Sequence, residues 1–357
     1  MEDRELLAQV PGLLLSWYDK NARVLPWRED PSPYRVWVSE IMLQQTRVEA
    51  VKPYYERFLA ALPTVADLAA APEEQLLKLW EGLGYYNRVR NLQKGAKAVM
   101  ERHGGVIPAD FDALRALPGI GDYTAGAIAS IAFQLSVPAV DGNVLRVTAR
   151  LLDRHDNILD PKVKRRAEGE ITAILPARVG DFNQSLMELG AMVCLPNGAP
   201  LCESCPLASL CRARALGNQA DLPVKAKPKP RRVEDRTLFL LTCGEKLALR
   251  RRPDTGLLAG LWELPAAEGT LTREEAAALL ARWGLNITGD LTPGAPSKHV
   301  FSHVEWHMTA WQAQVGEEAP GFAWATPEEL QREYPLPSAF AAYFPKGAKG
   351  GKTGGRR

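Results

Sequence analysis

Four of the five cysteines lie close together in the chain, where they could bind a metal. They are Cys194, Cys202, Cys205 and Cys211, separated by seven, two and five residues. Four thiolates in so short a stretch can converge on one soft metal centre, which is either a zinc ion or an iron–sulfur cluster. The spacing leaves both open. The long first gap suits a cubane, whose iron corners lie apart, better than the short paired loops common in zinc sites.

Asp141 and Glu40 are the two carboxylates whose positions suggest acid chemistry. Asp141 follows an apolar run in SVPAVDGNVLRV and begins a predicted helix. An aspartate there is a good N-cap, and its role could be purely structural. The N–H donors and the helix dipole would also keep such a carboxylate ionised, as stabilising a cationic sugar requires.

Glu40 lies in VWVSEIMLQQTRV, a predicted helix that is apolar on most sides. It is either a surface residue on a polar stripe or a partly buried acid. Burial would raise its pKa and allow it to donate a proton near neutrality. Four polar residues close to it in sequence could line the same groove: Ser39, Gln44, Gln45 and Thr46.

Such a pair of carboxylates is the arrangement used in glycoside hydrolysis. One protonated acid assists the leaving group, and one carboxylate faces the developing oxocarbenium ion. An N-glycosidic bond in DNA needs the same two roles. The nucleotide must also leave the base stack, and a side chain must fill the gap.

Residues 114–129, LRALPGIGDYTAGAIA, predict two helices joined by a tight turn. The first helix is expected to end near Leu117 and the second to begin near Thr124. Gly119 and Gly121 permit unusual backbone angles in the turn. The unpaired N–H groups of the second helix would bind a phosphate without reading a base. An ordinary turn between packed helices is the alternative.

These residues must be positioned by a mostly helical first domain, predicted over residues 1–216. Apolar residues recur at helical spacing in six segments: 36–48, 74–80, 92–102, 124–133, 144–152 and 163–174. A linker is expected over 217–236, where KAKPKP is a poor core segment. Beyond it, segments 236–241, 248–252 and 305–315 predict strands and 273–283 a helix. Residues 237–345 therefore predict a smaller α+β domain.

Composition and charge are those of an ordinary globular protein, with 46% hydrophobic and 24% charged residues and a net charge of +2. Basic residues gather in residues 225–236 and in the tail, 346–357; these segments are a solvated linker and a disordered tail unless they contact nucleic acid. The N-terminal residues fit neither a secretory signal nor a membrane span. We therefore expect a cytoplasmic protein, in which clustered cysteines are metal ligands rather than disulfides. The isolated Cys243 is expected to be buried.

The hairpin, the string VDGNVLRV and the four cysteines together resemble the endonuclease III superfamily of base-excision glycosylases. Within it, VSEIMLQQTRV, WEGLGYYNRVRNL and MELGAMVC are similar to the MutY adenine glycosylases. The resemblance covers nearly all of residues 20–345. It implies a helix–hairpin–helix domain with a six-helix barrel (about residues 25–135) and an iron–sulfur subdomain (residues 1–24 and 136–216), holding one 4Fe-4S cluster.

The resemblance also implies roles for individual residues. Glu40 would protonate the flipped adenine, and Asp141 would stabilise the oxocarbenium ion, directly or through a transient adduct. Asn143 and Tyr123 would support these steps. Arg28 and Glu188 would border the adenine pocket, while Gln45 and Tyr85 would insert into the stack, with Leu83 beside the lesion. The partner would be double-stranded DNA with adenine opposite 8-oxoguanine or guanine, bound by a bacterial monomer that does not associate with membranes.

Tyr123 decides the type of glycosylase. Bifunctional relatives carry a lysine at this position, and a phenol cannot form the Schiff base that a lysine amine forms. The resemblance therefore implies a monofunctional enzyme that uses water. The chain departs from the family in its first cysteine gap, which has seven residues where six is usual. That departure puts the local loop shape in doubt, but not the four ligands.

Residues 237–345 resemble the MutT-like, Nudix-type C-terminal domain of MutY. A working Nudix hydrolase needs a glutamate-rich helix that holds magnesium. The comparable helix, TREEAAALLARWGL, has Glu274 and Glu275 but lacks the further glutamates. We therefore expect binding without hydrolysis, with Phe301, Ser302 and His303 contacting 8-oxoguanine.

Three other functions remain as alternatives. An endonuclease III-like lyase acting on oxidised pyrimidines is disfavoured by Tyr123 and by the second domain. A non-catalytic damage-binding protein is disfavoured by the intact pair Glu40 and Asp141. A nucleotide-pyrophosphate hydrolase is disfavoured by the degenerate glutamate helix.

Overall fold

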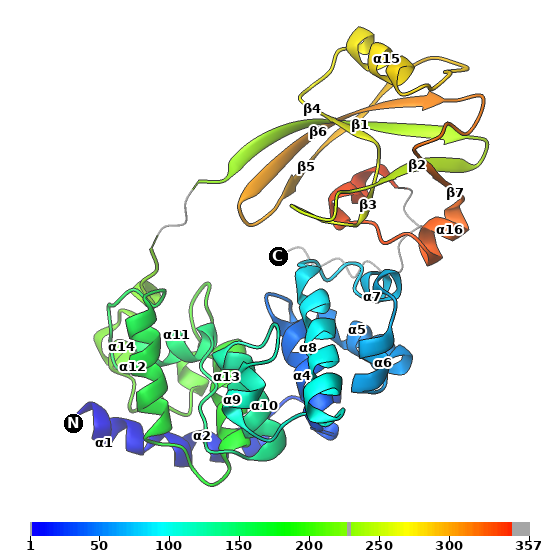
Figure 1. The fold of residues 1–357 in the computed structure, drawn as a ribbon. Coiled ribbons are helices and arrows are strands. Elements are labelled where there is room, and N and C mark those ends of the chain that lie inside the picture. Colours follow the sequence, from blue (N-terminus) through cyan, green and yellow to red (C-terminus); the bar gives the residue numbers. More distant parts are fainter. Residues whose placement is uncertain (1, 227–229, 345–357) are drawn as a thin grey trace. The chain divides into compact units, whose positions relative to one another are not determined.

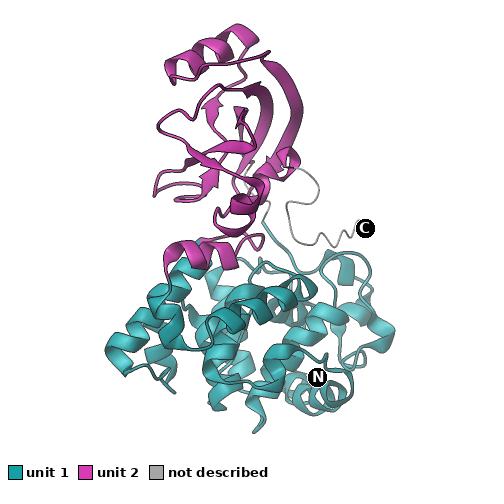
Figure 2. Cartoon of the chain, turned by 90° about the vertical axis from the view of Figure 1, so that its right-hand side faces the viewer, with its two compact units in different colours: residues 1–71, 87–227 teal, residues 72–86, 228–357 magenta. Residues whose placement is uncertain are grey.

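The computed structural model of the chain describes residues 2–226 and 230–344. It forms two compact units (Figure 2). The first comprises residues 1–71 and 87–227, and the second comprises 72–86 and 228–357. In the described residues the first unit is helical, and the second contains the β-sheet. The combination of a helical domain and a smaller mixed α+β domain confirms the predicted fold class.

The first unit consists of helices joined by short loops (Figure 1). Their bounds are α1 Asp3–Ala8, α2 Val10–Asn21, α3 Pro26–Glu29, α4 Pro33–Leu43, α5 Val48–Ala61, α6 Val65–Ala70, α8 Asn87–His103, α9 Phe111–Arg115, α10 Asp122–Phe133, α11 Gly142–Leu151, α12 Pro161–Thr172, α13 Val179–Met192, η1 Cys202–Ser204, α14 Arg212–Leu216 and η2 Gln219–Asp221.

Helix α10 lies at the centre of this unit. It packs against α4, α9 and α13. Its buried residues run almost without interruption from Thr124 to Ile131, because small and apolar side chains occupy nearly all its sides. A helix that is apolar all round must be enclosed by others. Helix α10 therefore fixes the positions of α4 and α13, which carry Glu40 and Glu188.

A separate hydrophobic core joins the N-terminal helices to the second half of the unit. Leu6, Leu7 and Leu14 are buried together with Val144 and Phe182. Cys194, Cys205 and Cys211 pack against the same core. The first residues of the chain therefore fold together with the cysteine-bearing segment.

Two predicted helix boundaries differ from the structure. The segment predicted as one helix over 36–48 is broken, because α4 ends at Leu43 and α5 begins at Val48. Gln45 has a left-handed backbone (φ 56°), which an α-helix does not tolerate. The second hairpin helix begins at Asp122, two residues before Thr124. Gly119 adopts φ 80°, as the tight turn requires.

The second unit is built on a seven-stranded mixed sheet. Its strand order is β3-β2-β1-β6-β5, with β4 paired to β1 and β7 to β2. Strands β1 and β6 are parallel, and the other pairs are antiparallel. The bounds are α7 Glu73–Leu79, β1 Arg232–Cys243, β2 Lys246–Arg251, β3 Trp262–Glu263, β4 Ala266–Glu268, α15 Arg273–Arg282, β5 Thr292–Val300, β6 Val304–Gln314, β7 Ala323–Ala325, α16 Pro327–Arg332 and η3 Ser338–Tyr343.

Alternate residues of β1 enter two different cores. Phe239 is buried with Leu280 of α15, which covers one face of the sheet (Figure 1). Leu238 is buried with Trp306 and with Phe340 of η3 on the other face. Successive strand side chains point to opposite faces, so both faces of β1 are covered.

The segment predicted as a linker, 217–236, is partly folded. Its first residues form η2, and the Ile158 amide donates to the Val224 carbonyl at 3.1 Å. Strand β1 begins at Arg232, before the predicted end of the linker, because its first residues pair with β6. The predicted tail, 346–357, lies outside the described residues. Among the described helices, none is both long and apolar enough to cross a membrane.

Candidate active site

A pocket of about 860 Å³ lies within the first unit and brings together half of the predicted catalytic and DNA-contacting residues. Seven residues given roles above line it: Arg28, Glu40, Gln45, Tyr123, Asp141, Asn143 and Glu188. The polar neighbours of Glu40 line it as well: Ser39, Gln44 and Thr46. Residues from five helices and two loops therefore converge, although they span much of the chain.

Of the two alternatives for Glu40, a surface residue or a buried acid, the structure shows the buried acid, because its side chain is only 7% exposed. Burial, together with the nearby charge of Asp141, raises its pKa to about 7. A hydrogen bond from Tyr123 acts in the opposite direction. At neutral pH a substantial fraction of Glu40 therefore carries the proton that a general acid must donate.

Asp141 caps α11, as predicted. Its Oδ1 accepts hydrogen bonds from the backbone amides of Asn143 and Val144, both at 2.8 Å. Its Oδ2 accepts one from the Asn143 side-chain amide at 2.7 Å. Burial raises the pKa of Asp141, and these hydrogen bonds oppose the rise. The donors expected from the sequence are present, but burial raises the pKa of Asp141 by more than these hydrogen bonds lower it.

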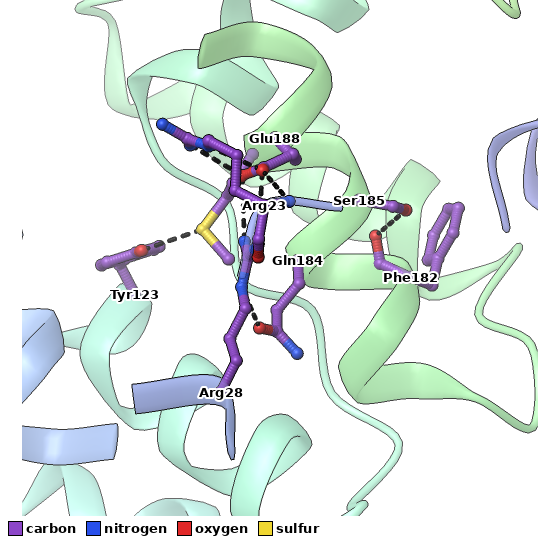
Figure 3. A network of polar contacts seen from close by, with 8 residues as sticks. Arg23, Arg28, Tyr123, Phe182, Gln184, Ser185 and Glu188 are labelled. Atoms are coloured by element: carbon purple, nitrogen blue, oxygen red, sulfur yellow. Dashed lines mark hydrogen bonds and ion pairs between the residues drawn. The ribbon is translucent and has the colours of Figure 1, made fainter. Parts of the chain in front are cut away.

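Tyr123, on α10, joins the acid to the neighbouring helix. Its hydroxyl donates to Glu40 Oε2 at 2.6 Å. The same hydroxyl lies 3.0 Å from Met187 Sδ (Figure 3). One proton cannot serve both acceptors fully, and a carboxyl oxygen is the stronger one. Burial raises the pKa of Tyr123 well above its ordinary value, so the phenol stays protonated.

Glu188 is the centre of a charged network on α13 (Figure 3). It is 1% exposed and accepts hydrogen bonds from the Arg23 backbone amide at 3.0 Å and from the Arg23 guanidinium at 2.7 Å. Arg28 donates to it at 2.9 Å and also to Gln184 Oε1 at 3.0 Å. Burial opposes ionisation of Glu188, but the two arginines outweigh it and lower its pKa to about 2. The network gives the pocket a rigid, charged wall.

The pocket residues that sequence reasoning missed include Arg23, Gln184 and Met187. Gln184 and Met187 lie four and one residues before Glu188 on one helix, so they share its face or border it. That spacing was a usable signal once Glu188 had been assigned. Arg23 precedes Glu188 by 165 residues and had no signal.

Asn143 is held on its other side by Arg146. The Arg146 Nη2 donates to Asn143 Oδ1 at 2.9 Å and to the Gly190 carbonyl at 2.7 Å, and its Nε donates to the Cys194 carbonyl at 2.8 Å. A Cβ added to Gly190 would lie 2.6 Å from the Cβ of Asn143. These contacts connect the support of Asp141 to the segment that carries the cysteines.

The four clustered cysteines line one small cavity. Arg150 Nη1 donates to Cys194 Sγ at 3.3 Å, and Gln219 Nε2 lies 3.7 Å from Cys202 Sγ. Within residues 2–226 and 230–344, no three His, Cys, Asp or Glu side chains are arranged to hold a single metal ion. The fifth cysteine, Cys243, is partly buried at the end of β1.

The hairpin turn approaches α8 closely. A Cβ added to Gly119 would lie 2.6 Å from the Cβ of Asn91, so this position suits glycine for space as well as for backbone angle. Gly121 has an extended backbone and is the N-cap of α10. The first turn of α10, which begins at Asp122, has the unpaired amides that phosphate binding needs.

Five predicted contact residues belong to the second unit, whereas the pocket lies wholly in the first. They are Leu83, Tyr85, Phe301, Ser302 and His303. The hydroxyls of Tyr85 and Ser302 lie 2.9 Å apart. The Phe301 ring packs edge-on against buried Trp306, with centroids 4.8 Å apart. Leu83 is buried, while Tyr85 is half exposed.

Comparison with known proteins gives two family matches. Residues 38–172 match the HhH-GPD superfamily of base excision DNA repair proteins, and residues 237–346 match the NUDIX domain. The chain is 38% identical to the adenine DNA glycosylase of Homo sapiens, covering 89% of this chain and 70% of that protein. It is 34% identical to the adenine DNA glycosylase of Schizosaccharomyces pombe, covering 82% and 78%.

Solved structures resemble the helical part of the chain. A thermostable thymine-DNA glycosylase aligns with a TM-score of 0.54 and 28% identity, covering 59% of this chain and 98% of that one. An endonuclease III trapped as a covalent intermediate with DNA aligns with a TM-score of 0.52 and 26% identity, covering 61% and 99%.

Proposed function

Because the chain belongs to the adenine DNA glycosylase (MutY) family, within the HhH-GPD superfamily of base-excision repair, we propose that it removes adenine paired with 8-oxoguanine or guanine, and that it does so without cutting the strand. The observation that carries this proposal is that Glu40 and Asp141 line one pocket with different environments. Glu40 has a pKa of about 7, and Asp141 is fixed as a helix cap.

In the proposed reaction, adenine leaves the stack and enters the pocket. The Glu40 carboxylic acid transfers its proton to a ring nitrogen of adenine, and the electron pair of the bond between the sugar and the base leaves with the base. The sugar becomes an oxocarbenium ion that faces the Asp141 carboxylate. Water then adds to the sugar carbon and gives a proton to the Glu40 carboxylate, which restores the acid and leaves an abasic site and free adenine.

The remaining pocket residues position these groups. Tyr123 orients the Glu40 carboxyl through its 2.6 Å hydrogen bond, and Asn143 orients Asp141. Arg28 and Glu188 border the adenine, while Gln45 fills the gap in the stack. Tyr123 also disfavours the lyase alternative, because its phenol cannot form a Schiff base with the sugar.

The second domain is proposed to read the lesion rather than hydrolyse nucleotides. Phe301, Ser302 and His303 would contact 8-oxoguanine, with Tyr85 inserted nearby. Glu275 of α15 is engaged as a cap, because its carboxylate accepts the Thr272 amide at 2.8 Å. A carboxylate used in this way is a poor magnesium ligand, which disfavours hydrolysis.

We propose that Cys194, Cys202, Cys205 and Cys211 hold a 4Fe-4S cluster. The donor set fits, because four thiols line one cavity and Arg150 donates a hydrogen bond to one of them. When bound, such a group would join the loop after α13 covalently to η1 and to the start of α14.

We expect purified protein to contain about four irons per chain and a broad visible absorbance. Cys205→Ser is expected to lower both the iron content and the thermal unfolding temperature, because one cluster ligand is lost. Cys243→Ser, which changes a cysteine in the other unit, is the matched control and should leave both unchanged. Stoichiometric zinc without iron in the wild-type protein would contradict the cluster.

The proposed activity is tested with duplexes that carry adenine opposite 8-oxoguanine. After incubation, half of each sample is treated with alkali, which cleaves the strand at abasic sites. We expect breaks only in the treated half, because the protein leaves an intact abasic strand. Breaks without alkali would indicate a lyase, and no breaks in either half would refute glycosylase activity on this mispair.

A further inference from the structure

The C-terminal end of α4, the helix that carries Glu40, is held by a residue from another helix. The last carbonyl groups of a helix lack partners within it. Arg88, near the start of α8, supplies one. Its Nη1 donates to the carbonyl oxygens of Ile41, Met42 and Gln44 at 2.9, 3.1 and 2.6 Å. A cation is also favourable at the negative end of a helix dipole.

The same guanidinium reaches the loop that follows. Arg88 Nη2 lies 3.5 Å from Thr46 Oγ1, and the Thr46 hydroxyl donates to the Gln44 carbonyl at 3.3 Å. Arg88 therefore contacts the residues on both sides of Gln45. Its planar guanidinium has several donors, so one side chain can bind both the end of α4 and the loop that follows.

Gln45 itself has the left-handed backbone that L side chains rarely adopt (φ 56°). Such a conformation is strained and persists only where the surroundings impose it. The contacts of Arg88 with Gln44 and Thr46 are such surroundings. Gln45, between these two residues, lines the same pocket as Glu40.

We propose that Arg88 is a positioning residue, which fixes the Gln45 loop at the end of the Glu40 helix so that Gln45 is preorganised to enter the DNA stack. This inference rests on the proposed function, in which Gln45 inserts beside the mispair. Glu40 is held separately, through Tyr123. Loss of Arg88 therefore affects binding of the opened duplex more than the chemical step within the bound complex.

The first experiment compares Arg88→Ala with Arg102→Ala. Both changes remove one positive charge from α8, but Arg102 is exposed in its last turn. The probe is a duplex with 8-oxoguanine opposite a non-cleavable 2′-fluoro adenine nucleotide. Arg88→Ala is expected to weaken binding about ten- to a hundredfold, because several charged hydrogen bonds are lost. Arg102→Ala should have only the small, salt-dependent effect of a lost charge.

The second experiment is a double-mutant cycle with Gln45→Ala. If Arg88 acts through the loop, the double variant binds about as weakly as the weaker single variant. Arg88→Lys, which keeps the charge and part of the hydrogen bonding, should recover part of the affinity and is available if Arg88→Ala does not fold. The single-turnover rate at saturating cleavable duplex should change less than the affinity.

Two outcomes separate the inference from the function on which it rests. If Gln45→Ala binds as tightly as wild type, the insertion role of Gln45 is refuted. If Gln45→Ala weakens binding but Arg88→Ala does not, or if the two losses add independently, the positioning role of Arg88 is refuted while the proposed function stands.

Discussion

Glu40→Gln is expected to slow adenine release by about a hundredfold or more, because a general acid contributes on that scale. Glutamine keeps the shape of the side chain and can accept the Tyr123 hydrogen bond, but it has no acidic proton to give to the base. The measurement is the single-turnover rate on a duplex with adenine opposite 8-oxoguanine. Binding to the non-cleavable duplex should be little changed, which would assign the loss to chemistry.

The pH dependence provides the control for this result. The pKa of Glu40 is raised to about 7 and its protonated form is the active one, so the wild-type rate should fall as the pH rises through about 7. Glu40→Gln should lose this titration. Tyr123→Phe should move the midpoint upward, because the Tyr123 hydrogen bond lowers the Glu40 pKa. A wild-type rate that rises with pH across this range would contradict the acid role.

Asp141→Asn is expected to reduce the single-turnover rate by about a hundred- to a thousandfold while the duplex still binds. The amide oxygen can still cap α11 by accepting the amides of Asn143 and Val144, so the fold should persist. It carries no negative charge to face the oxocarbenium ion. Thermal unfolding and affinity for the mispair, measured beside the rate, check that only chemistry is lost.

Asp160→Asn is the matched control for that experiment. Asp160 is the N-cap of α12 and accepts the Lys162 amide at 2.8 Å, but it does not line the pocket. The same substitution there should have a small effect on stability and none on the rate. Turnover near the wild-type value in Asp141→Asn would refute the role assigned to Asp141.

The parts of this structure that local sequence controls could be predicted. Asp141 was expected to cap a helix because it follows an apolar run, and Gly119 was expected in a tight turn because the turn needs positive φ. Helical spacing located α4, α7, α8, α10, α11, α12 and α15 approximately, but not α2, α5 or α13. The alternation of β1 is visible in Phe239 and its neighbours. These features depend on residues adjacent in the chain.

The features that depend on distant partners could not be predicted. The helix of Glu40 is apolar on most sides, so its pattern could not tell whether Glu40 faced solvent or the interior. The end of α4 at Leu43 was missed because Arg88, which binds that end, lies more than forty residues away. The partner of Glu188, Arg23, and the contact between Arg146 and the Cys194 carbonyl arise only from tertiary packing.

Arg23 and Arg28, which pair with Glu188 in the pocket wall, contribute to the net charge of the pocket in which the reaction is proposed to occur. Before reaction, the three arginines that line the pocket balance its three carboxylates, while protonated Glu40 and adenine are neutral; the arginines are Arg23, Arg28 and Arg47, and the carboxylates are Glu49, Glu188 and Asp141. After the bond breaks, Glu40 has become an anion, the sugar a cation and the base a neutral molecule, so the sum is again zero. No counterion has to enter or leave as the charge moves. The chemical step should therefore be insensitive to ionic strength, although assembly of the complex with DNA depends on it strongly.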